Sequence, residues 1–204
     1  MRATPSTLPV QTVAKVALFF ACLIPLSRLI WLAFAGGLGT NPIEFVTRST
    51  GTWTLVLLLI TLSITPLRHL TGRNALIRYR RMLGLFAFFY ACLHFTTYIW
   101  WDQFFEWPAI VKDIIKRPFI TIGFTAFVLL VPLAVTSTHA MQRRLKRRWQ
   151  QLHRLIYLIA ICGVVHYWWL VKKDVTEPAW YALALVALLG FRLVSRYINR
   201  SPPQ

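Results

Sequence analysis

Acidic side chains are scarce in this chain of 204 residues, which carries six Asp and Glu against 23 Lys and Arg. None of the six lies inside a long apolar run. Proton-coupled transporters depend on carboxylates within the membrane, so this absence argues against that class. Cysteine is scarce too, and its three positions, Cys22, Cys92 and Cys162, form no CxxC pair. They are therefore expected to be small core residues rather than disulfide partners or metal ligands.

The motifs of several common enzyme classes are also missing. The chain has no GxGxxG fingerprint and no P-loop, which argues against a nucleotide-binding enzyme. It has neither an HExxH motif nor a nucleophile elbow, which argues against a metalloprotease or a hydrolase. No paired, interrupted half-helices of the kind found in secondary transporters are evident. The sequence also shows no internal repeat.

What the chain does contain is apolar sequence, because 57% of its residues are hydrophobic and its mean hydropathy is +0.55. This composition is typical of a membrane protein. Six apolar segments come near the ~20 residues that a bilayer span requires. We therefore predict an all-α integral membrane protein, with residues 1–204 forming one domain and six helices crossing the bilayer as a bundle. The predicted spans are about 13–35, 52–67, 82–101, 119–138, 150–171 and 178–198.

The charges predict an orientation. A net charge of +17 is compatible with binding nucleic acid, but its distribution follows the positive-inside rule instead, so we expect no nucleic-acid partner. If the amino terminus is cytoplasmic, all six acids fall outside: Glu44, Asp102, Glu106, Asp113, Asp174 and Glu177. The inner side receives Arg2, Lys15, Arg68, Arg73, Arg78, Arg80, Arg81, Arg143, Arg144, Lys146, Arg147, Arg148, Arg154, Arg192, Arg196 and Arg200. Both termini are thus predicted to be cytoplasmic.

Two histidines, His94 and His166, lie at matching depth in the third and fifth segments, which run in the same direction. Histidine within a membrane usually marks function. Two neutral imidazoles at one level can ligate haem iron from both faces of the ring. Each histidine follows a small residue by three positions, Ala91 and Gly163, which would leave room for a flat ring. The alternative interpretation is an ordinary hydrogen bond between helices.

His153 lies thirteen residues before His166, about 20 Å away along a helix, and would suit a second, inner haem. Two observations complicate that hypothesis. The two histidines are roughly 140° apart around an ideal helix. The matching inner position of the third segment is held by Arg80 and Arg81, which suit a haem propionate or an anionic headgroup better than iron. Two further histidines could supply the missing ligand, although solvated loop positions are the simpler interpretation of both: His69 and His139.

Several short runs resemble the MsrQ (YedZ) family of membrane proteins, and the resemblance covers nearly the whole chain. The run from Trp149 to His153, Trp-Gln-Gln-Leu-His, is the most specific of them. The others are Arg80–Leu85, Leu93-His94, Thr136–Thr138, Ala140–Gln142 and His166-Tyr167.

The resemblance implies a haem-binding subunit of the bacterial inner membrane with a ferric-reductase-like transmembrane domain. Such a subunit takes electrons from the quinone pool and passes them to MsrP, a periplasmic molybdopterin enzyme that reduces methionine sulfoxide. The implied cofactors are haem b, one or two per chain, and FMN. The family's haem histidines correspond to His94, His153 and His166. In ferric-reductase relatives the third helix carries two histidines, whereas here arginine takes the inner position.

The resulting hypothesis is an electron-transfer subunit rather than the catalytic subunit of an oxidoreductase system. Two alternatives stay open. One is a transmembrane ferric or metalloreductase fed by a soluble cytoplasmic flavin reductase, which could dock on the basic run from Arg143 to Arg148. The other, of a different class, is a haem-free membrane transporter or scaffold.

Overall fold

The computed structural model describes residues 8–171 and 174–198, and it is all-α. Its helices follow in the order α1 (Leu8–Phe34), α2 (Pro42–Thr71), α3 (Arg80–Thr97), α4 (Trp107–Lys116), α5 (Pro118–Val135), α6 (His139–Leu145), α7 (Arg147–Leu152), α8 (Leu155–Leu170) and α9 (Thr176–Ile198). A 3₁₀ segment, Asn74–Tyr79, leads into α3, and a π-helical segment, Tyr98–Asp102, continues it.

The described residues contain six candidate membrane-spanning helices, the number that the sequence predicts. Six segments are long and apolar enough to cross a membrane. They are Val10–Phe34, Pro42–Thr71, Asn74–Asp102, Pro118–Val135, Arg147–Leu170 and Thr176–Ser195.

The boundaries of the second span differ most from the prediction, because α2 begins ten residues before the predicted 52–67. The polar residues Glu44 and Arg48 made this stretch look like a loop. Asn41 caps the helix by accepting the Glu44 backbone N–H at 3.2 Å, and Pro42 follows as a favourable first residue. Gly72, at φ 67°, ends the helix in the left-handed conformation that glycine adopts readily.

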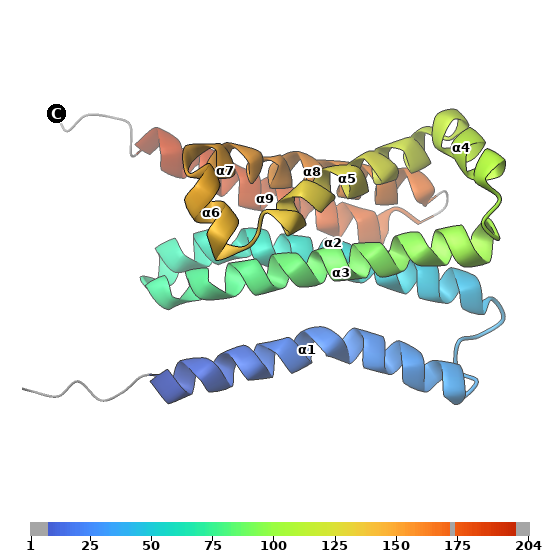
Figure 1. The fold of residues 1–204 in the computed structure, drawn as a ribbon, viewed down its shortest axis with the longest axis horizontal. Coiled ribbons are helices and arrows are strands. Elements are labelled where there is room, and N and C mark those ends of the chain that lie inside the picture. The colour runs from blue at the N-terminus through green and yellow to red at the C-terminus, as the bar shows by residue number, and fades with distance from the viewer. Residues whose placement is uncertain (1–7, 172–173, 199–204) are drawn as a thin grey trace, which may run out of the picture.

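Sequence reasoning missed α4, which is only ten residues long and carries charges. Its exposed apolar residues, Trp107, Val111 and Ile115, recur every four positions, whereas Ile110 on another side is buried. Figure 1 shows α4 at one end of the bundle, beside the end of α3 and inclined to the long helices. The fourth span is also shorter than predicted, because α5 ends at Val135.

The long helices run side by side, and the described chain begins and ends at the same end of the bundle (Figure 1). We call this the near end, and the opposite end, where α4 lies, the far end. The most extensive contacts join α2 to α3 and α5 to α8, while α1 touches α2 and α3 at the periphery. All six acids belong to far-end segments, as predicted. Arg2, Arg200 and the side chain of Arg196 lie outside the described residues.

Prolines inside the spans leave nearby backbone groups without their usual helical hydrogen bonds, and side chains of other helices bond to those groups instead. Pro66 has no N–H to donate to the Leu62 carbonyl, and Arg192 of α9 donates to that carbonyl instead, at 2.6 Å. Arg192 also donates to the Tyr157 hydroxyl of α8 at 2.9 Å. Arg192 therefore ties α2, α8 and α9 together inside the bundle.

A second bridge joins α1 to α3. The fully buried Tyr90 hydroxyl donates to the Cys22 carbonyl at 2.8 Å and accepts the Leu26 N–H at 3.1 Å, next to Pro25. In an uninterrupted helix the Leu26 N–H would bond to the Cys22 carbonyl directly. The tyrosine thus inserts into the α1 ladder at its proline.

We expect Arg192→Met to lower the unfolding free energy of the detergent-solubilised protein by about 1–3 kcal/mol, because a buried carbonyl loses its donor. Denaturant titration followed by circular dichroism measures the loss. Leu193→Met, at a residue that is 67% exposed, is the matched control and should be neutral. Equal stability of the two variants would contradict the bridging role of Arg192.

Candidate haem-binding site

His94 of α3 and His166 of α8 line one cavity of about 390 Å³ between α2, α3, α5 and α8. Their ring centres are 6.2 Å apart, and the ring planes are inclined at 75°. Ala91 and Gly163, the small residues singled out in the sequence, line the same cavity. Most of the remaining wall is apolar, and includes Leu55, Leu58, Phe95, Phe124, Phe127 and Leu130.

His94 is held against α2. Its Nδ1 lies 2.9 Å from the Thr47 carbonyl oxygen. Its ring lies over Gly51, where a Cβ would come within 3.0 Å of the imidazole. Any larger residue at position 51 would therefore push the ring away. Close contact of the histidine with the α2 backbone depends on this glycine.

His166 is held against α5 in the same manner. Its Nδ1 lies 2.7 Å from the Phe119 carbonyl oxygen. A Cβ at Gly123 would lie 2.7 Å from that same Nδ1 and 2.8 Å from Cε1. Since real Cβ atoms essentially never approach so closely, Gly123 is the tighter of the two contacts.

The two arrangements match each other, although the sequence itself has no internal repeat. Each histidine bonds to a carbonyl 47 residues earlier in the chain. Each also lies over the glycine four positions after that carbonyl, Gly51 or Gly123. The equivalent units are the packed pairs α2–α3 and α5–α8. The two pairs share their helix packing and the spacing of three residues: the one that supplies the carbonyl, the glycine and the histidine. They do not share an extended run of similar sequence.

These hydrogen bonds fix the tautomer of both rings. A carbonyl can only accept, so Nδ1 must carry the proton in each histidine. In a neutral imidazole Nε2 then keeps its lone pair, which is the arrangement that metal-binding histidines need. Among the described residues, no hydrogen bond involves Nε2 of His94 or His166. Both rings therefore offer one unprotonated nitrogen.

The ring separation fits a metal between the two imidazoles. A metal–imidazole bond is about 2.0–2.1 Å long and the nitrogen lies roughly 1 Å from the ring centre, so axial rings on one metal are roughly 6 Å apart. The observed 6.2 Å agrees with this value. Two nitrogen donors in a mostly apolar cavity with small residues on its walls fit a haem iron and its ring.

His153 lies apart from this cavity, at the near end between α7 and α8. Its ring stacks on Trp149 with centres 3.9 Å apart, and its Nδ1 lies 3.1 Å from the Trp149 carbonyl oxygen. Its Nε2 is buried and has no hydrogen-bond partner in the described part of the chain. His153 thus has the same tautomer as the other two, with its second nitrogen unsatisfied.

The other predicted site residues are at the near end. Arg80 is half-buried at the start of α3, close enough to His153 for their charges to interact, whereas Arg81 is exposed. His69 is exposed and packs against Phe191 of α9, and His139 is exposed at the start of α6. None of these four lines the cavity that contains His94 and His166.

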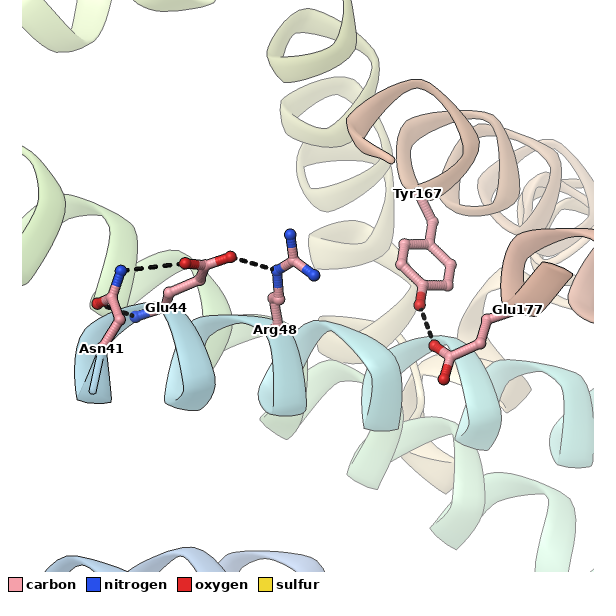
Figure 2. A network of polar contacts seen from close by, with 5 residues as sticks. All are labelled: Asn41, Glu44, Arg48, Tyr167 and Glu177. Atoms are coloured by element: carbon pink, nitrogen blue, oxygen red, sulfur yellow. Dashed lines mark hydrogen bonds and ion pairs between the residues drawn. The ribbon is translucent and has the colours of Figure 1, made fainter. Parts of the chain in front are cut away.

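Sequence reasoning missed the polar residues that line the far end of the cavity: Arg48, Asp102, Gln103, Arg117 and Tyr167. Arg48 is paired with Glu44 at 2.8 Å, and Tyr167 donates to Glu177 at 2.6 Å (Figure 2). They were missed because most of them were assigned to loops. The spacing of 43 residues, which separates Gly51 from His94 and Gly123 from His166, was the one signal that could have indicated the two glycines.

Comparisons with known proteins identify the family of the chain. The family model described as "Ferric reductase like transmembrane component" matches residues 48–164, a stretch that includes Gly51, His94 and Gly123. The relative from Herminiimonas arsenicoxydans is 54% identical over 196 residues, which are 95% of this chain and 90% of the relative.

Two further relatives are as similar. The protein from Bordetella pertussis is 49% identical over 202 residues, or 98% of each chain, and that from Ralstonia nicotianae is 54% identical over 194 residues, 93% of this chain and 89% of the relative. All three carry the name protein-methionine-sulfoxide reductase heme-binding subunit MsrQ. The chain therefore belongs to the MsrQ family, within the wider group of ferric-reductase-like transmembrane proteins.

Proposed function

We propose that this protein is a membrane electron-transfer subunit that binds haem b, takes electrons from the quinone pool and passes them to MsrP. In this proposal MsrP, a periplasmic molybdopterin enzyme, reduces methionine sulfoxide in oxidised proteins. The observation that carries the proposal is the pair of backbone-anchored imidazoles, His94 and His166, 6.2 Å apart in one cavity. Membership of the MsrQ family supports it.

The chain's own residues position and insulate the redox group. His94 and His166 would hold the haem iron through Nε2, and the carbonyls of Thr47 and Phe119 hold their rings in place. The apolar walls keep water from the ring, while Ala91 and Gly163 give it room. When bound, haem supplies reversible one-electron chemistry at iron. The protein then conducts electrons, and the sulfoxide chemistry belongs to its partner.

We propose that both termini are cytoplasmic and that the far end is periplasmic, in the inner membrane of a bacterium. The charge distribution supports this orientation, because every acid lies in a far-end segment and the arginine-rich segments lie at the near end. In that orientation the histidine pair lies in the periplasmic half, towards MsrP. The whole chain then acts as one transmembrane domain.

We also propose that His153 is a haem ligand nearer the cytoplasmic face. Its buried Nε2, which has no hydrogen-bond partner among the described residues, supports this role, since such atoms are rarely left unsatisfied. Arg80 and Arg81 are the proposed partners of a propionate or anionic group at that level. FMN is proposed as a further cofactor on the family resemblance.

Purified protein in liposomes tests the electron path. We expect a membrane-soluble quinol to reduce the low-spin haem without any soluble flavin enzyme. Adding MsrP and methionine sulfoxide should then reoxidise it, because the far-end site faces that acceptor. Absorption spectroscopy follows both steps, and quantifying haem and flavin per polypeptide gives the cofactor count. A protein reduced only by a soluble flavin reductase with NADH, and never by quinol, would be a metalloreductase instead.

A further inference from the structure

We propose that Arg48 and Arg117 form a two-arginine carboxylate site at the far end of the cavity, which binds the two propionates of the haem. The inference rests on the proposed haem binding and deepens it. It assigns the propionates of the ring held by His94 and His166 to residues other than Arg80 and Arg81, which do not line this cavity.

The two arginines lie near the far-end starts of α2 and α5, with Arg48 on the second turn of α2 and Arg117 directly before α5. Arg48 directly follows Thr47, whose carbonyl holds His94. Arg117 comes two residues before Phe119, whose carbonyl holds His166. Both arginines line the cavity beyond the histidines. Haem held by the two histidines would therefore share its cavity with two guanidinium groups, one from α2 and one from the residue before α5.

The guanidinium of Arg48 is held in place through Nε, and its two terminal nitrogens remain available to a ligand. Its Nε lies 2.8 Å from Glu44 Oε1, and Glu44 is itself held by the side chain of Asn41 at 3.0 Å. Figure 2 shows the two terminal nitrogens of Arg48 on the side of the guanidinium away from Glu44. Tyr167 lies farther along on that same side. Those nitrogens have no partner among the described residues. They form the fork that binds a carboxylate bidentately.

Arg117 is also held by an acid four residues earlier, but through a terminal nitrogen rather than Nε. One terminal nitrogen, Nη1, lies 3.3 Å from Asp113 Oδ2, four residues earlier in the chain. Asp113 is only 16% exposed and also accepts a hydrogen bond from Gln103 at 3.2 Å. The remaining donors of Arg117 stay available, because an arginine carries five N–H groups and the aspartate engages one nitrogen.

Two hydroxyl groups indicate that a polar ligand belongs at this end. The side-chain oxygens of Thr47 and Tyr98 are buried and have no hydrogen-bond partner in the described part of the chain. Both residues line the cavity, and the Tyr98 hydroxyl lies within electrostatic range of Asp113, Arg117 and Asp102. Buried hydroxyls are rarely left without a partner. A propionate oxygen would accept a hydrogen bond from each.

The test distinguishes binding through the carboxylates of haem from binding through its iron. Apo-protein is reconstituted with haem or with haem dimethyl ester, which keeps the iron but cannot form carboxylate hydrogen bonds. Retention is measured for the wild type, Arg48→Gln, Arg117→Gln and the double variant. We expect wild-type protein to prefer the free acid, by about tenfold for each arginine. The double variant should lose most of this preference, because only the hydroxyls of Thr47 and Tyr98 remain to bind the carboxylates.

Lys112→Gln is the matched control, since Lys112 is an exposed far-end cation outside the cavity lining. It should keep the wild-type preference. Arg48→Lys keeps the charge but loses the fork, and should fall between the wild type and Arg48→Gln. A low-spin spectrum in each variant verifies that the histidines and the fold are intact.

The outcomes distinguish the inference from the proposed function. If the preference for the free acid is the same in the double variant as in the wild type, while all spectra stay low-spin, the arginine site is overturned and the histidine site stands. If the wild-type protein binds neither form, the proposed haem binding itself fails. A preference that is largely lost only with the arginines supports both.

Discussion

Replacing His94 with alanine is expected to abolish the low-spin haem absorption of the purified protein. The variant removes one of the two Nε2 donors that face the same cavity, so the iron would keep a single axial nitrogen. A five-coordinate iron has a high-spin spectrum, and the loss of a ligand should lower haem occupancy by more than the 10–100-fold that the loss of a ligand's supporting group typically costs. Visible absorption and a pyridine haemochrome assay measure both effects.

The equivalence of the two helix pairs adds a second requirement. His166→Ala should have the same effect as His94→Ala, because each ring is held by a carbonyl 47 residues away and lies over a glycine. His69→Ala is the matched control, since His69 is exposed and outside the cavity, and its spectrum should equal the wild type. A wild-type spectrum in His94→Ala would end the ligand hypothesis.

The second large effect is expected from a single methyl group at Gly123. In Gly123→Ala the new Cβ would lie 2.7 Å from Nδ1 of His166, where no side-chain carbon fits. The imidazole must then move and lose its 2.7 Å hydrogen bond to the Phe119 carbonyl. Losing that supporting bond should cost about 10–100-fold in haem affinity and shift the midpoint potential, because the ring becomes a weaker donor.

The other glycines provide graded controls for this prediction. Gly51→Ala should have a smaller effect on His94, since its Cβ would lie at 3.0 Å. Gly190→Ala should have none, because no neighbouring atom lies within 4 Å of that Cβ. Haem titration and potentiometry give the order of the three variants. If Gly123→Ala matched Gly190→Ala, the contact of His166 with α5 would be disproved.

The sequence was sufficient to predict six spans and to place His94 and His166 at one level, because both features depend on the spacing of side chains. It did not predict how the rings are held. The acceptors are the backbone carbonyls of Thr47 and Phe119. Every residue has a backbone carbonyl, so the residue type does not reveal which one accepts. Gly51 and Gly123 are visible in the sequence, but an isolated glycine in an apolar run can also reflect ordinary helix packing.

The far-end residues were missed for a different reason. Glu44 and Arg48 were assigned to a loop because an apolar window cannot recognise a helix whose first turns are polar. Asn41 and Pro42 carry the signal for that start. With the helix begun at Pro42, Arg48 falls on its second turn, and its position beside the cavity follows from the same helix that places Gly51.

The matched anchoring of His94 and His166 has a consequence for the reorganisation energy of electron transfer. Both imidazoles receive the same kind of backbone acceptor, so their donor strengths should be nearly equal. Neither side chain would then have to move when a redox group held by the two residues changes its charge. Both rings are also fixed to the packed helices α2 and α5 rather than to loops. Such a centre needs little rearrangement between its oxidised and reduced states, which favours fast exchange of single electrons.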